Sequence, residues 1–410
     1  MTLSLALLFA YSVLLVGLGL WIGRRARAGD FFVAGRTLGP GLLFSSFLAA
    51  NIGASSTVGA TSLAYTEGLS AWWWNGSAGL GSLVLAFWVA PRMWREAVAH
   101  GDLTLGDFLE RRYGRPMRGL VGVLIWLGTL SILAAQLLGV AAVLGIAGGY
   151  SMLTGCVVGA LVTVAYFVAG GLLSSVWVNM VQLIVIVIGF ALATAAGLSR
   201  VGGWETLAAQ AAPRVDFFAS SGPASGWRLI FLLGPAFIVS PGLIQRAYAA
   251  RDERSARHGI ALNGLALLLF ACAPAVIGMA ARQLAPGLER ADLALPTLLS
   301  TAMPPALGAL ALAAVFSAEV SSAYAVLYML ATSASRDLYR GFVSPQATDR
   351  DVLRVARAAA IVGAVCGVGV AMVYGSVRAA VSVFYAILTV TLFVPVIGAL
   401  LTRRTGRAEG

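Results

Sequence analysis

The chain has 410 residues, of which 59% are hydrophobic and only 11% are charged, and its formal net charge is +11. Soluble domains carry about a quarter charged residues, so this composition excludes an ordinary soluble protein and favours one embedded in a lipid bilayer. An excess of basic over acidic residues can also indicate nucleic-acid binding. Here the arginines lie between hydrophobic segments, where they set membrane topology, so we expect the bilayer and no nucleic acid as a partner.

Windows of roughly 20 apolar residues recur along the chain, and each is long enough to cross the hydrocarbon core as a helix. No polar stretch is long enough for a soluble domain. We therefore predict a single transmembrane domain over 1–410, of the all-α class, with about eleven transmembrane helices. The expected spans are 3–22, 41–66, 70–91, 119–147, 150–169, 172–198, 227–246, 259–281, 305–334, 354–374 and 379–401.

The arginines predict the orientation of these spans. If the N-terminus lies outside, most of the 28 arginines fall in segments on the cytoplasmic side, as the positive-inside rule requires. We therefore expect an external N-terminus and a cytoplasmic C-terminus.

The spans also divide into two halves. We predict a leading helix and inner loop over 1–40, five-helix halves over 41–200 and 226–402, and a short cytoplasmic tail over 403–410. The two halves face opposite ways because five is odd, and this arrangement is typical of inverted-repeat transporters.

The opening helix of each half is interrupted by residues that weaken a helix. The first half reads Ala-Ala-Asn-Ile-Gly-Ala-Ser-Ser over 49–56, and the second contains Gly234-Pro235 and then Ser240-Pro241-Gly242. Irregular backbone at membrane depth is tolerated where it lines a cavity. The alternative is a pair of ordinary kinks.

Glu319 is the only acid well inside a predicted span. A carboxyl group inside the membrane is costly and is a functional candidate by default. Glu319 could be neutral and structural, it could bind a cationic group of the substrate, or it could carry a coupling proton.

Two serines follow Glu319 on the same predicted helix. The carbonyl of Ala318 and the hydroxyls of Ser321 and Ser322 can lie near one another at this spacing, and the interrupted helix could add carbonyls near Ala49 and Ile52. Several oxygen ligands suit a small hard cation. The alternative is that the serines only pack against a neighbouring helix.

Several motifs carry a family resemblance. The segments Asp-Phe-Phe-Val-Ala-Gly-Arg at 30–36 and Thr-Leu-Gly-Asp-Phe-Leu-Glu-Arg-Arg-Tyr-Gly at 104–114 resemble conserved segments of the sodium/solute symporter family. Further similar positions are Gly170-Gly171-Leu172 followed by Trp177, Gln245-Arg246, and Ser321-Ser322 followed by Arg336-Asp337-Leu338-Tyr339. The resemblance implies a LeuT-type fold, a 5+5 inverted repeat with one extra N-terminal helix, in a bacterial inner (cell) membrane.

The resemblance also implies a sodium site. It assigns the main-site ligands to the carbonyls of Ala49, Ile52 and Ala318 and the hydroxyls of Ser321 and Ser322. Sodium is then the coupling ion, and we expect no other metal and no cofactor. A second sodium site is doubtful, because the acid that relatives often carry is replaced by Asn179 and their Asp or Ser by Tyr324.

The substrate-binding candidates are polar or aromatic residues at or near the two interruptions. Ser56 matches a position where sugar-transporting relatives have a substrate-binding Gln. The full set is Asn51, Ser56, Asn75, Gln136, Phe237 and Ser240. The polar members could instead make packing hydrogen bonds.

We therefore predict a secondary active transporter that couples sodium to a small polar solute, such as an amino acid, a sugar or an organic acid, by alternating access. An enzyme is not expected, because the spans hold one acid and no histidine. The alternatives are a proton-coupled transporter or uniporter using Glu319, or a sensor or receptor with a transporter fold. The chain has no lysine, and arginine is expected only near helix ends, so nothing in the sequence marks a carboxylate substrate.

Overall fold

The computed structural model describes residues 5–10, 12–14, 17, 36–169, 172–211, 214–222 and 225–402. Several predicted features lie outside the described residues. These are residues 30–35 of the first motif, Gly170-Gly171, the side chain of Trp177, the tail 403–410 and part of the leading helix.

The described residues form helices and no strand, which confirms the predicted all-α class. Leu38 and Ala250 form one isolated parallel bridge. The helices are α3 Pro40–Asn51, η2 Ser55–Gly59, α4 Ala60–Glu67, η3 Gly68–Ala71, α5 Trp72–Val84, η4 Leu85–Val89, α6 Ala90–His100, α7 Leu105–Tyr113, α8 Arg115–Gly148, α9 Met152–Ala169, α10 Leu172–Arg200, α11 Trp204–Ala211, η5 Gly226–Leu229, α12 Ile230–Ile238, α13 Pro241–Tyr248, α14 Glu253–Phe270, α15 Cys272–Leu284, η6 Ala291–Leu293, α16 Ala294–Ala302, α17 Pro305–Thr332, η7 Ser333–Val343, α18 Asp349–Tyr374 and α19 Val377–Leu401.

Helices occupy each of the ten ranges predicted between 41 and 401. Among the described residues, seven helices are long and apolar enough to cross a membrane, and one bent pair could add an eighth span. The apolar helix at 152–168 is shorter than that limit. The total of about eleven spans therefore stays a prediction.

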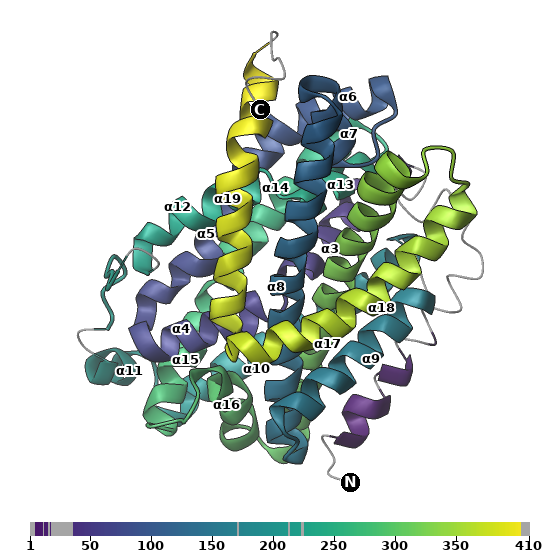
Figure 1. Cartoon of the computed structure of the whole chain (residues 1–410). Helices are drawn as coiled ribbons and strands as arrows, with labels where there is room; N and C mark the ends of the chain where they lie inside the picture. The colour runs from purple at the N-terminus through teal and green to yellow at the C-terminus, as the bar shows by residue number, and fades with distance from the viewer. Residues whose placement is uncertain are drawn as a thin grey trace.

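The long helix α8 stands near the centre of the molecule and organises the helices around it (Figure 1). It packs against α17, α19, α9 and α18. Among the spans that the structure describes, the one formed by α17 and η7 is the most enclosed, with 94% of its most apolar window buried. A helix that is apolar on all sides is buried among other helices, so α17 can present its few polar side chains only to other protein groups or to an internal cavity.

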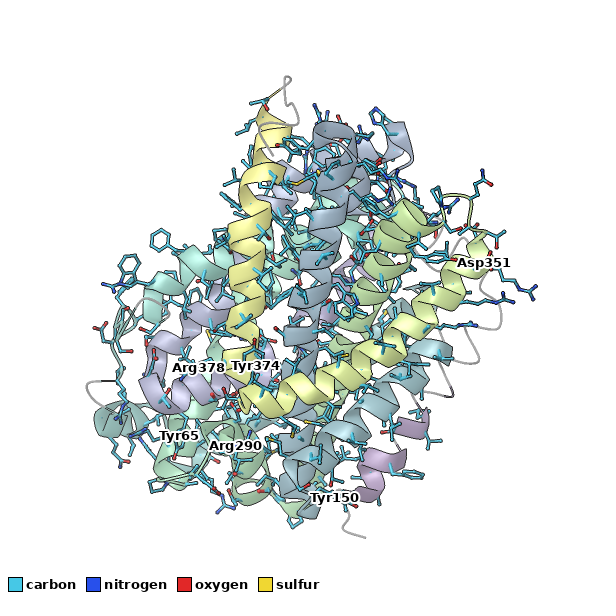
Figure 2. The ribbon with its side chains drawn as sticks, in the orientation of Figure 1. Tyr65, Tyr150, Arg290, Asp351, Tyr374 and Arg378 are labelled. Atoms are coloured by element: carbon cyan, nitrogen blue, oxygen red, sulfur yellow. The ribbon has the colours of Figure 1, made fainter. Side chains whose placement is uncertain are left out.

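The two ends of the helix bundle differ in their connections. Helices α6 and α7 lie at the end where α19 finishes, and α11 and α16 lie at the opposite end (Figure 1). Figure 2 shows Tyr65 and Arg290 toward the α16 end and Asp351 toward the other. The arginine-rich connection around α7 thus lies at the same end of the bundle as the last residues of α19 (Figure 1). The predicted topology places both on one side of the membrane.

The first predicted interruption is a true break. Helix α3 ends at Asn51, a π-helical turn begins at Ser55, and the helices on the two sides are bent by 61°. Contacts of α3 with α10, α13, α14 and α17 hold the first segment, whereas α4 packs mainly against α15. The break therefore lies where the chain passes from one set of neighbours to another.

The second predicted interruption is narrower than expected. The prediction that Gly234-Pro235 interrupts the helix is wrong, because both residues lie inside α12. Proline removes only its own N–H donor, and the hydrogen bonding resumes after it, with the Val239 N–H donating to the Pro235 carbonyl at 3.2 Å. The break comes at Ser240, and Pro241 opens α13 at the position where its missing N–H costs least.

Close contact between α4 and α15 fixes the segment that follows the first break. Gly278 on α15 lies so close to α4 that a Cβ would overlap the Thr61 carbonyl and come within 2.5 Å of the Ala64 Cβ. Only glycine permits this separation of the two helices.

We predict that Gly278→Ala lowers the thermal unfolding temperature of the purified protein by several degrees, because overpacking costs about 1–3 kcal/mol. Gly369→Ala is the matched control, since Gly369 is also helical and a Cβ there meets nothing within 4 Å. The control should leave the temperature unchanged or raise it slightly, because alanine has the better helix propensity. Equal effects of the two variants would contradict the close packing described here.

Candidate functional site

The first broken helix loses its hydrogen-bond ladder because side chains take two of its backbone donors. The Gly53 N–H donates to the Ser56 hydroxyl at 3.0 Å, and the Ala54 N–H donates to Gln136 Oε1, from α8, at 2.8 Å. A regular helix would use these two donors for the carbonyls four residues earlier. Those carbonyls are therefore left without their helical partners.

The freed carbonyls belong to Ala49 and Ala50, and they lie against Ser322 of α17. The Ser322 hydroxyl oxygen is 3.0 Å from the Ala49 carbonyl, 3.4 Å from that of Ala50 and 3.1 Å from that of Ile52. One hydroxyl has one proton and donates it to one acceptor at a time. The other contacts bring oxygens together without a shared proton, an arrangement that suits a small cation.

Ser321 extends this oxygen cluster on the same helix. Its hydroxyl is 3.5 Å from the Ala49 carbonyl and donates to Asn179 Oδ1 at 3.0 Å. The structure thus places Ala49, Ile52, Ser321 and Ser322 close together, and their role as sodium ligands stays a prediction. Ala318 is fully buried on α17, one turn before Ser321, and whether its carbonyl joins the cluster stays a prediction.

A glycine allows α17 to approach the break this closely. A Cβ at Gly53 would overlap the Ser322 side chain and lie 2.6 Å from Gln136 Oε1. The absence of a side chain at Gly53 is therefore a geometric requirement of the oxygen cluster.

Glu319 contacts the broken helix through Thr57. The Thr57 hydroxyl oxygen is 2.8 Å from the Gly53 carbonyl and 2.7 Å from Glu319 Oε1. Because the hydroxyl has one proton, both contacts are hydrogen bonds only if Thr57 donates to the carbonyl and a protonated Glu319 donates to Thr57. Glu319 is fully buried, and its Oε2 has no hydrogen-bond partner among the described residues, which also suits a neutral carboxyl group.

A small cavity adjoins the oxygen cluster. Its volume is about 60 Å³, and four of the six predicted substrate-binding residues line it. These are Asn51, Gln136, Phe237 and Ser240. Other lining residues are Ala50, Ser55, Ile132, Ala236, Gly242, Leu243, Arg246, Ala325, Val326, Met329, Phe384 and Tyr385.

Most of the predicted polar substrate ligands already bind protein groups. Asn51 donates to Asn263 Oδ1 at 3.0 Å, and Asn75 donates to the Ser56 carbonyl at 2.9 Å. The Ser56 hydroxyl donates to the Asn51 carbonyl at 2.7 Å. Ser56 and Asn75 do not line the cavity, so in this conformation these two residues support the break.

Three residues around the cavity were missed by the sequence analysis. Ser55 accepts from the Trp74 indole N–H at 3.2 Å and is hydrogen-bonded to Tyr385. Arg246 was expected near a helix end on the cytoplasmic side, but its side chain is 5% exposed and lines the cavity. The available signal was an arginine on α13, the helix that begins directly after the break at Ser240.

A second polar cluster ties together the helices at the α7 end. Thr104 donates to Asp337 Oδ1 at 2.7 Å, and Arg118 pairs with Asp107 at 3.0 Å and Glu110 at 2.7 Å. Arg118 also lies 3.6 Å from Asp337. These bonds link α7, α8 and η7, so the motif at 104–114 serves to join helices at this end.

Asp102 and Arg111 form an ion pair beside that cluster, at 2.6 Å. Burial raises the pKa of Asp102 above its usual value, and the Arg111 hydrogen bond and charge oppose this shift. Arg36 donates to the Asp102 carbonyl at 2.8 Å, and burial lowers the pKa of Arg36. The chain that leads into α3 is thereby fastened to the α6–α7 connection.

Comparison with known proteins gives this geometry a family context. Residues 31–407 match the model of the Sodium:solute symporter family. The chain is 26% identical over 415 residues to the Sodium/glucose cotransporter of Vibrio parahaemolyticus, and the alignment covers 90% of this chain and 74% of that protein. It is 26% identical over 396 residues to the Sodium/pantothenate symporter of Escherichia coli (strain K12), covering 88% of this chain and 77% of that protein.

Other relatives are covered less fully. The human Sodium/iodide cotransporter is 27% identical over 279 residues, and the match covers 64% of this chain but only 42% of that protein. The chain is thus shorter than the curated relatives that it matches.

Solved structures confirm the transporter fold. A Na+-coupled sialic acid symporter in a substrate-bound outward-open state matches with a TM-score of 0.84 and 18% identity, over 100% of this chain and 88% of that one. A nucleobase-cation-symport-1 family transporter in a closed conformation matches with a TM-score of 0.55 and 14% identity, over 81% of this chain and 72% of that one. With a family match over 31–407, the chain belongs to the sodium:solute symporter family.

Proposed function

We propose that this protein is a secondary active transporter that couples the entry of sodium to that of a small polar solute by alternating access. The observation that carries the proposal is the oxygen cluster formed by the broken helix and Ser322. We interpret this cluster as an ion site because the chain belongs to a family of transporters.

Sodium would occupy the oxygen cluster. The Ser322 hydroxyl oxygen is 3.0 Å from the Ala49 carbonyl and 3.1 Å from the Ile52 carbonyl, and the Ser321 hydroxyl is 3.5 Å from the Ala49 carbonyl. Carbonyls freed by a broken helix are the usual sodium ligands of such transporters. With the Ala318 carbonyl, these residues form the site that we propose for the coupling ion.

The adjacent cavity would hold the solute. Asn51, Gln136, Phe237 and Ser240 line it, and we propose that they contact the solute directly. Ser56 and Asn75 would act by holding the break in shape. An amino acid, a sugar and an organic acid all fit a site of this mixed polar and apolar character.

We also propose how the protein is placed in its membrane. The N-terminus would face outward and the C-terminus the cytoplasm of a bacterial cell, with the arginine-rich α6–α7 connection inside. The separation of α6 and α7 from α11 and α16 at opposite ends of the bundle supports this orientation (Figure 1).

Proton coupling through Glu319 is a second candidate, favoured by one contact. Glu319 contacts Thr57, which follows the break in the first broken helix, so a change in its protonation would change a hydrogen bond of that helix. The structural alternative is that neutral Glu319 fastens α17 to the break.

We predict that Ser322→Ala weakens sodium binding about tenfold or more, because a ligand lost from an ion in a dry site is not readily replaced. The measurement is binding of radioactive sodium to the purified protein. Ser45→Ala is the matched control, since Ser45 is a buried serine on α3, the first part of the broken helix, and its hydroxyl bonds only the Leu42 carbonyl. Equal sodium affinities of the two variants would refute the assigned site.

We predict that Glu319→Gln keeps the sodium-dependent thermal stabilisation of the protein, because an amide can also donate to Thr57. Glu319→Ala should lose several degrees of unfolding temperature, since it removes the hydrogen bond and leaves a cavity. Solute uptake that loses its pH dependence in Glu319→Gln while its sodium dependence is intact would instead favour the proton-coupled candidate.

A further inference from the structure

A second cavity lies at the α11 end of the bundle, away from the oxygen cluster (Figure 1). Its volume is about 180 Å³, and α4, η3, α11, α15 and the connection after α11 contribute to its wall. Its polar lining residues are Gln210, Arg214, Arg282 and Gln283. The other described lining residues are small or apolar, and none is acidic. The described wall of this space, which we call the arginine cavity, thus carries two positive charges and no negative one.

Arg282 is held in place by α4 and still has donors for a ligand. Its Nη1 donates to the Tyr65 carbonyl at 3.0 Å, and its guanidinium carbon lies 5.6 Å from the centre of the Tyr65 ring. Figure 2 shows Tyr65 at this end of the bundle. Its Nε and Nη2 make no hydrogen bond with a described residue, and neither is enclosed by protein. Tyr65 therefore orients the planar fork of Arg282 and leaves most of its N–H groups available.

Arg214 is brought to the cavity by its backbone. The Leu69 N–H donates to the Arg214 carbonyl at 2.9 Å, and the Arg214 N–H donates to the Ala211 carbonyl at 2.7 Å. Gly68 permits this approach, because its φ is +85° and a Cβ there would overlap the Arg214 carbonyl. The connection after α11 is thus fastened to the end of α4. The Arg214 side chain is exposed and makes no hydrogen bond with a described residue.

The acids nearest in sequence to these arginines have other partners. Glu67 directly precedes Gly68, but its carboxylate lies 3.9 Å from Arg378 and is hydrogen-bonded to Ser221. Asp216 Oδ1 accepts the Phe218 N–H at 2.9 Å. Among the described acids, none forms an ion pair with either arginine of the cavity. Two arginines that share a cavity without an acid attract an anion into it.

Size and donor count restrict the kind of anion. A water needs about 10–15 Å³ of such space, so about 180 Å³ holds roughly 12 to 18 waters, enough for a tetrahedral oxyanion with part of its hydration shell. A phosphate group near neutral pH carries close to two negative charges, which two arginines would balance. Its oxygens accept paired hydrogen bonds from the edge of a guanidinium. The amide of Gln210 adds further donors from α11.

We propose that the arginine cavity binds a phosphate group, with Arg214 and Arg282 as its charge partners. The ligand is either inorganic phosphate or the phosphate of an anionic lipid headgroup. Bound there, it bridges the connection after α11 to α15 across the end of α4. The inference goes beyond the proposed symport function and does not depend on it, because none of the described residues of this cavity belongs to the sodium or solute site.

The first test measures binding of radioactive orthophosphate to the purified, lipid-free protein in detergent by equilibrium dialysis. We expect one saturable site. Sulfate should displace the bound phosphate at a concentration where chloride does not, because a halide cannot use the paired donors of a guanidinium. Absence of saturable binding would overturn the proposal, and so would equal displacement by chloride.

Variants of the two arginines test the residues. Arg214→Gln and Arg282→Gln should each weaken phosphate binding about tenfold or more, because each loses a charge-assisted hydrogen-bond partner. Arg228→Gln is the matched control, since Arg228 is an exposed arginine of η5 that does not line the cavity. If loss of the Tyr65 contact prevents Arg282→Gln from folding, Arg214→Gln decides. An unchanged phosphate affinity in that variant would refute the site.

Lipids distinguish the two sources of the phosphate group. Bound orthophosphate would be challenged with phosphatidylglycerol in mixed micelles and, as the matched control, with diacylglycerol, which lacks the phosphate. Displacement by phosphatidylglycerol alone assigns the cavity to a lipid headgroup, and displacement by neither assigns it to the free anion. Both results support a phosphate site. Equal displacement by the two lipids would contradict it, because the acyl chains would then be what the cavity binds.

Thermal unfolding gives a second readout. Phosphate also stabilises proteins without binding, through its exclusion from their surface, so the informative quantity is the difference between the unmodified protein and Arg214→Gln. We expect a saturable rise in unfolding temperature with phosphate that this variant lacks, and equal rises would count against the proposal. Arg214→Gln should bind radioactive sodium as the unmodified protein does. A protein that binds phosphate but no sodium would refute the proposed function and leave the phosphate site standing.

Discussion

The contact between Ser322 and the broken helix is the interaction on which the rest of the site depends. Gly53 and Ala54 give their backbone donors to side chains, so the carbonyls one turn earlier must find other partners or remain exposed in a dry interior. Ser322 supplies one proton for several carbonyls, which is insufficient. The shortage of donors makes this part of the chain electronegative, and a cation is the simplest group that satisfies all of its oxygens together.

Charges in the interior of the bundle have to be considered together. Arg246 carries a positive charge beside the cavity without an acidic partner among the described residues, and Glu319 is placed to be a neutral donor to Thr57. Sodium in the oxygen cluster would add a second positive charge close to the cavity that Arg246 lines, so the two charges would repel each other.

Local sequence predicted the elements whose cause is local. Apolar windows located the helices, and the residues from 49 to 56 located the first break, because small and polar side chains that compete for backbone donors are visible in the sequence. Gly234-Pro235 looked like a second break but lies inside α12, since whether one lost donor ends a helix depends on its neighbours. The place of Arg246 soon after the second break was visible in the sequence, but its burial was not, because residues of α17 and α19 line the cavity with it. Asn75 looked like a solute ligand but binds a backbone carbonyl, a partner that only the folded chain brings near.

The same short segment serves both proposed ligands, and this explains how they can be coupled. Ala50 contributes a carbonyl to the oxygen cluster and also lines the cavity. Gln136 holds the Ala54 N–H and lines the cavity as well. Sodium bound to the cluster would therefore fix the wall of the cavity, and a solute in the cavity would fix the carbonyls around sodium. Because such coupling is reciprocal, a change that loosens the break should weaken the binding of both ligands.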